Sequence, residues 1–413
     1  MNKDKTNKGR RFFLIGLGGV GAAVLAHKLY PATRAKEGNS ALDLDNNNQE
    51  YSLRELAASK GILYGGFTQR SAKELPQDDK FKQVFVKEYG AVVGGFFGVV
   101  VGPFGRNNYD FSQTDVFLDF ARQNDLPFRG HPLIWNEFNS PWLVEKFKST
   151  DTTSAEIDEI FVNHITTLAK RHAGKVHSWD VVNEAIRVED GRKDNLKDTS
   201  IGGIRGEKYP AWLNYLGGEY IERAFKIAAE ADPQAILTYN DNGLVYSNPF
   251  GTSYEEKRRA AVLDLLSDLK AKGTPVHALG IQSHLWGHRN DEFDAQKFRK
   301  FLSDVASMGL KIIISELDVR DSELPRDIAL RDRLVAQAYY EYLSVVLDEP
   351  AVTTIVSWGL SDRHTWLSKR APREDGAEVR PLLLDREYIR KPAWEAVARA
   401  LSEAPVRGDG NSN

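Results

Sequence analysis

The sequence predicts an α/β protein that folds as one (β/α)₈ barrel of the TIM type. Three observations predict it. Eight strand-like stretches alternate with helix-like stretches from residue 53 to residue 402. The strand-like stretches are runs of β-branched and aromatic residues, as expected of parallel strands buried on both faces. The alternating region spans about 350 residues, which suits eight β/α units with some long loops.

The predicted strands leave room for a helix between neighbours. In chain order they are Ile62–Phe67, Ala91–Val101, Pro127–Ile134, Val176–Asn183, Ala235–Asn240, Ala278–Ser283, Lys311–Ser315 and Thr353–Ser357. The segments between them repeat apolar residues at three- and four-residue spacing, which is typical of amphipathic helices. These predicted helices are Phe111–Gln123, Ile157–Arg171, Tyr220–Ala231, Tyr254–Lys272, Phe298–Met308, Asp327–Leu347 and Ala393–Leu401.

An open, doubly wound sheet is the alternative arrangement of these elements. A dinucleotide-binding sheet would carry a Gly-x-Gly-x-x-Gly turn directly after its first strand. No such turn follows Phe67, and the closest match, Gly16-x-Gly18-Gly19, lies near the N-terminus, ahead of the predicted domain. The barrel is therefore the preferred fold.

The composition excludes several classes of function. The chain has 413 residues, of which 41% are hydrophobic and 27% charged, as in a soluble protein of one large domain or two ordinary ones. A formal net charge of -3 offers no basic surface for nucleic acid. The chain contains no cysteine, which excludes disulfides, a catalytic thiol and thiolate metal sites.

The N-terminal residues predict export. Arg10 and Arg11 precede an apolar stretch from Phe12 to about Ala26, which resembles a twin-arginine export signal. That stretch is shorter than the about 20 residues that span a membrane. We predict an export segment over 1–31, a polar linker over 32–50 and a disordered tail over 404–413, with the protein in the periplasm or outside the cell. The alternatives are a retained membrane tether and a short basic, hydrophobic helix.

Two glutamates at predicted strand ends indicate the chemistry. Glu184 follows the strand in the segment WDVVNE, and Glu316 follows the strand in IIISELD. A carboxylate at the end of a buried strand needs water, a partner or a ligand, since an unpaired buried charge is expensive. Two such carboxylates at one end of a barrel supply the acid and the nucleophile or base that glycosidic bond cleavage requires. Taken singly, each is equally well explained as a salt-bridged acid.

Polar and aromatic side chains also gather at the predicted C-terminal ends of six strands. They are His131, Trp135, Asn183, Glu184, Asn240, Asp241, Gln282, His284, Glu316, Asp318, Trp358, Asp362 and Trp366. The carboxyl ends of barrel strands form the active site in enzymes of this fold. Carboxylates and amides bind sugar hydroxyls, while indole rings stack on the apolar faces of sugar rings. The set therefore predicts a carbohydrate site.

The motifs together resemble glycoside hydrolase family 10, the retaining β-1,4-xylanases. The segments that carry the resemblance are RGHPLIW at 129–135, WDVVNEA at 179–185, YND at 239–241, GIQSHL at 280–285, SELD at 315–318, SWGLSD at 357–362, and PLLLD at 381–385 with KPA at 391–393. They occur in the family's order and cover roughly residues 53–402. The resemblance implies that residues 51–403 form a glycoside hydrolase domain.

The resemblance also implies roles for the site residues. Glu184 would be the general acid and base, and Glu316 the nucleophile, with their carboxyl groups about 5–5.5 Å apart. Asn183 would bind the sugar 2-hydroxyl at the reacting subsite. Asp318 would hold His284, which in turn keeps Glu316 ionised. Gln282 would support Glu184, while His131, Trp135, Trp358 and Trp366 would form the walls, with Asn240 and Asp241 in supporting positions.

The second strand departs from the family pattern. Family members carry a Glu, an Asn and a Lys there that hold the next sugar, whereas this chain places Gly95, Phe96 and Val99 opposite them. No charged residue occurs between Glu88 and Arg106. Each lost hydrogen bond is worth about 0.5–1.5 kcal/mol. A second departure is Asn242-Gly243, where relatives commonly place an aromatic residue. The sequence therefore predicts weakened or redirected specificity.

We accordingly predict an exported, monomeric, retaining endo-β-1,4-xylanase that binds a polysaccharide and needs no cofactor or metal. His284 and His288 have His-x-x-x-His spacing, but they follow a strand rather than lying on a helix. The alternatives are a β-glycanase or glycosidase of shifted specificity, and a noncatalytic glycan-binding protein. No contact with nucleic acid, or of the mature domain with a membrane, is expected.

Overall fold

The structure is a computed structural model that describes residues 51–95, 108–188, 196–197, 199–202, 207–247 and 254–407. The predicted export segment and linker lie outside the described residues, as do residues 96–101 of the predicted second strand and residues 408–413 of the predicted tail. In the described part, no helix combines the length and the apolar composition that a bilayer crossing needs.

The described strands form a closed barrel. Its eight parallel positions are β1 (Leu63–Phe67), β2 (Ala91–Gly95), β3 (Phe128–His131), β5 (Ser178–Asn183), β8 (Ile236–Asp241), β9 (Ala278–Ile281), β11 (Lys311–Arg320) and β12 (Val352–Ser357). β1 pairs with both β2 and β12, which closes the ring. The barrel prediction is confirmed, and the open sheet is wrong because the first and last strands are hydrogen-bonded neighbours.

Short strands extend two barrel positions toward the C-terminal rim. β4 (Ile134–Trp135) pairs with β5, and β10 (His284–Trp286) pairs with β11. A separate antiparallel hairpin consists of β6 (Thr199–Gly202) and β7 (Glu207–Pro210). The hairpin follows β5, so it belongs to one of the loops at the rim where barrel active sites form.

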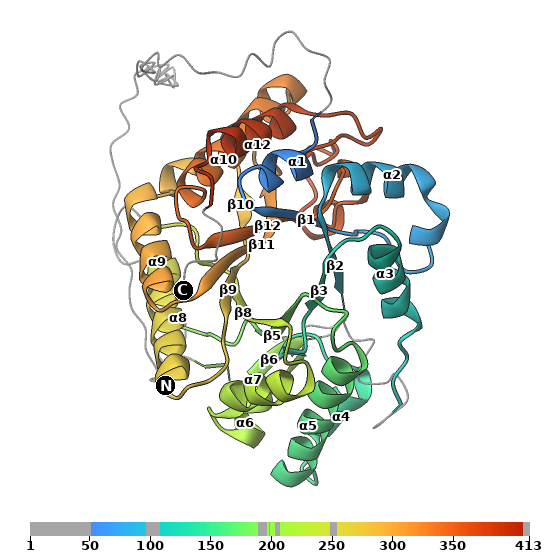
Figure 1. The fold of residues 1–413 in the computed structure, drawn as a ribbon, viewed down its shortest axis with the longest axis vertical. Coiled ribbons are helices and arrows are strands. Elements are labelled where there is room, and N and C mark those ends of the chain that lie inside the picture. The colour runs from blue at the N-terminus through green and yellow to red at the C-terminus, as the bar shows by residue number, and fades with distance from the viewer. Residues whose placement is uncertain are drawn as a thin grey trace, which may run out of the picture. The chain divides into compact units, whose positions relative to one another are not determined.

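A ring of helices surrounds the strands in Figure 1. The helices are α1 (Leu53–Ala58), α2 (Asp79–Glu88), α3 (Ser112–Gln123), α4 (Pro141–Lys148), α5 (Ser154–Arg171), α6 (Trp212–Leu216), α7 (Tyr220–Ala231), α8 (Tyr254–Ala271), α9 (Ala295–Ser307), α10 (Ile328–Val346), α11 (Leu367–Arg370) and α12 (Pro392–Glu403). Every helix predicted from spacing is present, with ends within three residues of those expected. The sequence reading missed α1, α2, α4, α6 and α11, of which α1, α6 and α11 have six residues or fewer and show too little periodicity.

The predicted strand Lys311–Ser315 is too short. β11 runs on to Arg320 because β10 pairs with its second half, with His284 opposite Asp318. The register of β11 against β12 shifts between Ile314 and Leu317. Glu316 therefore lies within an irregular strand rather than after its end, and a shift of this kind turns side chains away from the regular alternation.

The barrel leaves no room for side chains at some glycines. A Cβ atom on Gly130 would lie 2.2 Å from the Trp179 ring of the neighbouring strand. Trp179 is fully buried, and its indole nitrogen donates to Asp232 at 3.0 Å. Glycine at residue 130 lets this large ring fill the space between β3 and the helices.

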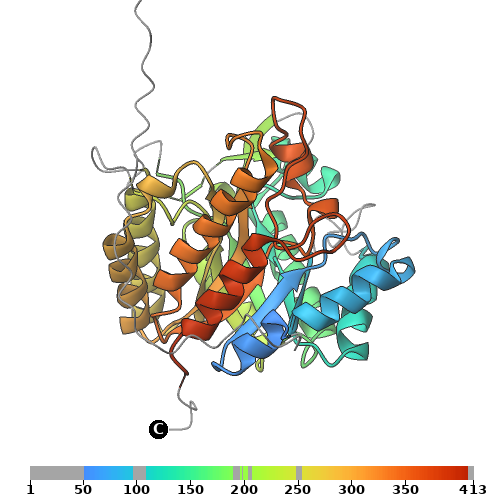
Figure 2. The same cartoon turned by 90° about the horizontal axis from the view of Figure 1, so that it is seen from above.

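Glu88 joins both ends of the described domain. Its buried carboxylate accepts hydrogen bonds from the Leu53 backbone nitrogen at 3.1 Å and from the Trp394 indole at 3.0 Å, and it pairs with Arg390 at 2.7 Å. α1 and α12 accordingly lie side by side in both views (Figure 1 and Figure 2). This contact fastens the first helix of the described domain to the last.

Candidate active site

A cavity of about 620 Å³ opens at the C-terminal ends of the barrel strands. It brings together most of the side chains that the sequence predicted for the site. Those that line it are His131, Trp135, Glu184, Gln282, His284, Glu316, Trp358 and Trp366. Asn183, Asn240 and Asp318 are fully buried and hydrogen-bonded to lining residues or to one another. Residues far apart in the chain therefore converge on one hollow that contains both glutamates.

Glu184 lies directly after β5 with an exposed fraction of 7%. Its Oε1 accepts from Gln282 at 2.9 Å and its Oε2 from the Trp135 indole at 3.2 Å. Burial raises the pKa of Glu184 above its usual range, although Lys197, with its Nζ 3.9 Å from Oε2, acts in the opposite direction. Glu137 contributes to the rise. Glu184 is thus the carboxyl group that holds a proton more strongly.

Glu316 has the opposite electrostatic setting. Its Oε1 accepts from Asn240 at 3.0 Å, and its Oε2 contacts His284 Nε2 at 3.1 Å. Burial alone would raise the pKa of Glu316, but the hydrogen bond from His284, the nearby His131 and the Asn240 amide together hold that pKa below its usual range. Glu316 is therefore the group that stays ionised.

His284 links Glu316 to a second carboxylate. Its Nδ1 lies 2.8 Å from Asp318, whose other oxygen accepts from the Trp366 indole at 2.8 Å. Burial opposes a charge on His284, but Asp318 and Glu316 outweigh it and raise the pKa of His284 to about 10. The imidazole therefore carries a positive charge at neutral pH and donates a hydrogen bond to each carboxylate.

An amide network connects the two glutamates. Asn183 Oδ1 accepts from Asn240 at 2.9 Å and from Gln282 at 3.1 Å. The same two amides donate to Glu316 and Glu184, respectively. Asn183 Nδ2 is buried and makes no hydrogen bond within the described residues. The network therefore leaves one buried amide donor, on the residue before Glu184, without an acceptor among the described residues.

The remaining predicted walls are also in place. His131 Nδ1 lies 2.7 Å from Asp180, which pairs on its other side with Arg129. The Trp358 ring stacks on Phe67, with centroids 4.3 Å apart and an interplanar angle of 12°. Because Phe67 also lines the cavity, the end of β1 contributes an apolar surface that the sequence reading did not predict.

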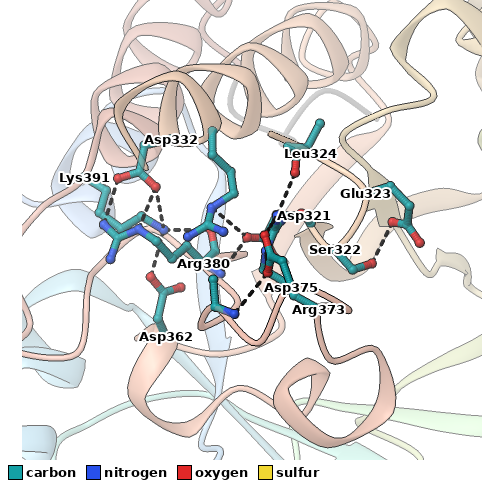
Figure 3. Close-up of polar contacts among 12 residues, drawn as sticks. Asp321, Ser322, Glu323, Leu324, Asp332, Asp362, Arg373, Asp375, Arg380 and Lys391 are labelled. Carbon is teal, nitrogen blue, oxygen red and sulfur yellow. Dashed lines mark hydrogen bonds and ion pairs between the residues drawn. The ribbon is translucent and has the colours of Figure 1, made fainter. Parts of the chain in front are cut away.

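Two residues predicted at the rim lie away from the cavity. Asp241 is fully buried and binds Arg258 at 3.2 Å, the Asn242 backbone nitrogen at 2.8 Å, and Tyr239. Asp362 pairs with Lys391 at 2.8 Å inside a group of buried ion pairs (Figure 3). Burial raises the pKa of Asp362 to about 6 despite that lysine. Asp241 holds the loop after β8, and Asp362 follows β12 as expected but belongs to a buried ion-pair group and does not line the cavity.

The sequence reading missed Lys197 and Glu137. Lys197 is 5% exposed, and its Nζ binds Glu137 at 2.8 Å. Both side chains approach Glu184 from loops, and Glu137 also lines the cavity. Neither residue belongs to a recognisable motif. The only indication in the sequence is that each follows a site motif, Glu137 after RGHPLIW and Lys197 after WDVVNEA.

The second strand contributes little that is polar in its described portion. β2 ends at Gly95, opposite His131 in the next strand, and Gly95 offers no side chain for hydrogen bonding. Phe96 and Val99 lie outside the described residues. In the part of the chain that the structure describes, no group of histidines and carboxylates has an arrangement that could hold a metal ion, and His288 pairs with Glu323 instead.

Comparisons with known proteins agree on one family. The sequence matches the model of glycosyl hydrolase family 10 over residues 52–400. It is 28% identical to endo-1,4-beta-xylanase B of Thermotoga neapolitana over 86% of this chain and 93% of that protein. It is 30% identical to an endo-1,4-beta-xylanase of Geobacillus stearothermophilus over 71% of this chain and 82% of that protein.

A solved structure shows the same fold. Xylanase 10B of Thermotoga petrophila, crystallised in complex with xylobiose, superposes with a TM-score of 0.73 at 28% identity. The match covers 87% of this chain and 99% of that one. The family match includes the whole barrel and every motif that builds the cavity. This chain therefore belongs to glycosyl hydrolase family 10 and is a glycoside hydrolase.

Proposed function

We propose that this chain is a retaining endo-1,4-β-xylanase, with Glu184 as the general acid and base and Glu316 as the nucleophile. The observation that carries the proposal is that two buried carboxyl groups in one cavity have pKa values moved in opposite directions, upward for Glu184 and downward for Glu316. A retaining glycosidase needs one acid that keeps its proton and one carboxylate that stays ionised. The xylanase names of the relatives support xylan as the substrate.

The two glutamates divide the reaction between them. Glu316 attacks the anomeric carbon while Glu184 gives its proton to the departing glycosidic oxygen, which leaves the glycone esterified to Glu316. Glu184, now ionised, removes a proton from a water molecule that attacks the same carbon. The ester bond breaks, Glu316 leaves as a carboxylate, and the product keeps the anomeric configuration of the substrate.

The surrounding side chains set the positions and the ionisation states of these two glutamates. The charged His284 keeps Glu316 ionised before attack and stabilises it as a leaving group afterwards. The free Nδ2 of Asn183 supplies a donor for the 2-hydroxyl of the reacting sugar, a bond that strengthens in the transition state. Gln282 orients Glu184 through a 2.9 Å hydrogen bond.

We infer that the glycone side of the cavity relies on apolar contact. Gly95 offers no hydrogen-bonding side chain, whereas Phe67 and Trp358 present a stacked aromatic pair to the cavity. Apolar contact with aromatic faces does not select between sugars through hydrogen bonds to particular hydroxyl groups. This arrangement supports a xylanase with weaker selection of the sugar that precedes the cleavage site.

The test is hydrolysis by the purified protein of xylan, cellulose and an aryl β-xylobioside, with proton NMR to follow the anomeric configuration of the first product. Glu184→Gln and Glu316→Gln should each abolish xylan cleavage, and the wild-type product should keep the β configuration. Glu255→Gln is the matched control, because Glu255 lines the same cavity but is ion-paired with Arg289 at 3.2 Å. It should retain most of the activity.

Other outcomes would change the assignment. Cleavage of only cellulose or the aryl glycoside would keep the mechanism and replace the substrate. Binding of xylan without cleavage would favour the noncatalytic alternative. Inversion of configuration would refute the role of Glu316 as nucleophile.

Xylan is a polymer that cells meet outside the membrane, which supports the predicted export. Arg10 and Arg11, on which that prediction rests, lie outside the described residues.

A further inference from the structure

Among the described residues that line the cavity, the charged side chains are paired, with one exception. Glu137 pairs with Lys197 at 2.8 Å, and Glu255 pairs with Arg289 at 3.2 Å. Arg289 also binds Glu292 at 2.6 Å, and Glu316 binds the charged His284 at 3.1 Å. Glu184, the remaining acid of the lining, has a raised pKa.

The exception is Arg370. It lines the cavity, is exposed, and makes no side-chain hydrogen bond or ion pair with any described residue. The other charged side chains of the described lining lie beside an opposite charge, whereas the guanidinium of Arg370 does not. The cavity therefore offers an uncompensated cation to whatever binds there.

The local backbone places Arg370 beside a sugar-binding wall. Its backbone nitrogen donates to the Trp366 carbonyl at 3.1 Å, so the two residues lie one helical turn apart and share a face of α11. Trp366 itself is fixed through its indole to Asp318. The neighbouring Lys369 is also exposed but does not line the cavity.

The segment that carries Arg370 is firmly anchored. Arg373, three residues further on, donates to the Leu324 carbonyl at 2.8 Å and pairs with Asp375 at 2.7 Å. Arg380 makes a two-pronged contact with Asp332, with nitrogen–oxygen distances of 2.8 and 2.7 Å. Figure 3 shows these residues as one connected set of polar contacts. Because these contacts already restrict the segment, it loses less conformational entropy when a ligand binds to it.

We propose that Arg370 binds the carboxylate of a uronic-acid branch on the polysaccharide, which makes acidic xylan the preferred substrate. Guanidinium groups match carboxylates with two parallel hydrogen bonds, whereas the unbranched backbone of xylan has hydroxyl groups only. The inference rests on the proposed function, since it assumes that the cavity binds xylan. It adds a charge-based selection that the two glutamates do not provide.

The test compares glucuronoxylan with the same polymer after its carboxyl groups have been reduced to alcohols. Both substrates keep the same backbone and branching, so the ratio of their kcat/KM values isolates the effect of the carboxylate. The wild-type protein should prefer the acidic polymer by roughly 1.5-fold to fivefold, the range of an exposed charge pair. Arg370→Gln should bring that ratio to about one, and the control Lys369→Gln should keep it.

Affinity electrophoresis of the same proteins in gels containing each polymer separates the two hypotheses. If the wild type cleaves neither polymer but binds the acidic one more tightly, and Arg370→Gln loses that difference, the xylanase assignment fails and the role of Arg370 stands. Equal rates and equal binding on both polymers would overturn the role of Arg370. A preference that Arg370→Gln retains, or that Lys369→Gln removes, would overturn it as well.

Discussion

Lys197 controls how strongly Glu184 holds its proton, and Lys197→Met tests this directly. Methionine fills a similar volume and removes the charge together with the hydrogen bond to Glu137. Lys197 is the main charge that lowers the pKa of Glu184, against the effect of burial. Its removal should favour the protonated acid, so the basic limb of the pH profile of kcat/KM should move to higher pH.

The magnitude follows from the geometry. Nζ of Lys197 lies 3.9 Å from Oε2 of Glu184, a separation at which two unit charges interact by about 1 kcal/mol in bulk water and about 4 kcal/mol at a protein surface. Glu137, 2.8 Å from the same lysine, is present in both proteins, so its own charge acts on Glu184 in each of them. A net effect of about 1.5 kcal/mol corresponds to a move of roughly one pH unit.

The assay is kcat/KM on an aryl β-xylobioside across the pH range in which circular dichroism shows the variants to be folded. kcat/KM reports on ionisations of the free enzyme. Glu137→Gln is the matched counterpart, because it removes a charge that raises the pKa of Glu184, and its basic limb should move to lower pH. Equal or same-direction movement of the two variants would refute this account of the site.

Three further predictions follow from the same contacts. The wild-type profile of kcat/KM against pH should be bell-shaped, with its acidic limb set by Glu316, and every variant that keeps His284 should keep that limb; a rate independent of pH would contradict the opposite pKa directions. Asn183→Ala should lower kcat by about 100-fold with little change in KM, measured on the aryl substrate, because its donor acts in the transition state; a change in KM alone would refute this. Glu88→Ala should destabilise the fold by about 3 kcal/mol in urea unfolding, since it removes the ion-pair partner of Arg390 and leaves two buried N–H donors without an acceptor; a loss under 1 kcal/mol would contradict it.

The barrel was predictable because its signals are local. Each strand is a compact apolar run, and helices such as Tyr220–Ala231 show the spacing of one buried face. The convergence of most of these residues on one cavity was predictable because motifs at strand ends meet wherever a parallel barrel closes. These inferences need only the chain order and the rule that barrel strands end at one rim.

Electrostatic partners were harder to predict because they depend on side chains that meet across loops. Asp362 carries a charge at the end of a rim motif, yet Lys391, distant in sequence, draws it into a buried ion pair. Arg370 and Lys369 are adjacent arginine and lysine residues that only the turn of α11 distinguishes. Lys197 lies in a loop whose path determines which carboxylate it meets. The periodicity of apolar residues along the chain does not predict these contacts between side chains.

The backbone at both glutamates departs from the regular strand in a way that serves the site. Side chains alternate between faces along a strand, so two consecutive residues normally cannot reach one cavity. Glu184 has a φ of 55°, one of four positive values among the described non-glycine residues, and this turn lets Asn183 and Glu184 share the Gln282 amide.

At the other glutamate, the register shift in β11 has the same consequence. Ser315 donates to Asn240 Oδ1 at 2.6 Å, while Glu316 accepts from Asn240 Nδ2 at 3.0 Å. Consecutive residues again reach one amide. A left-handed backbone at a glutamate costs about 1 kcal/mol or more, and it persists because Glu184 N donates to the Asn240 carbonyl at 2.8 Å. Asn240 therefore anchors both irregularities, which explains how one buried amide can set the positions of the acid and the nucleophile together.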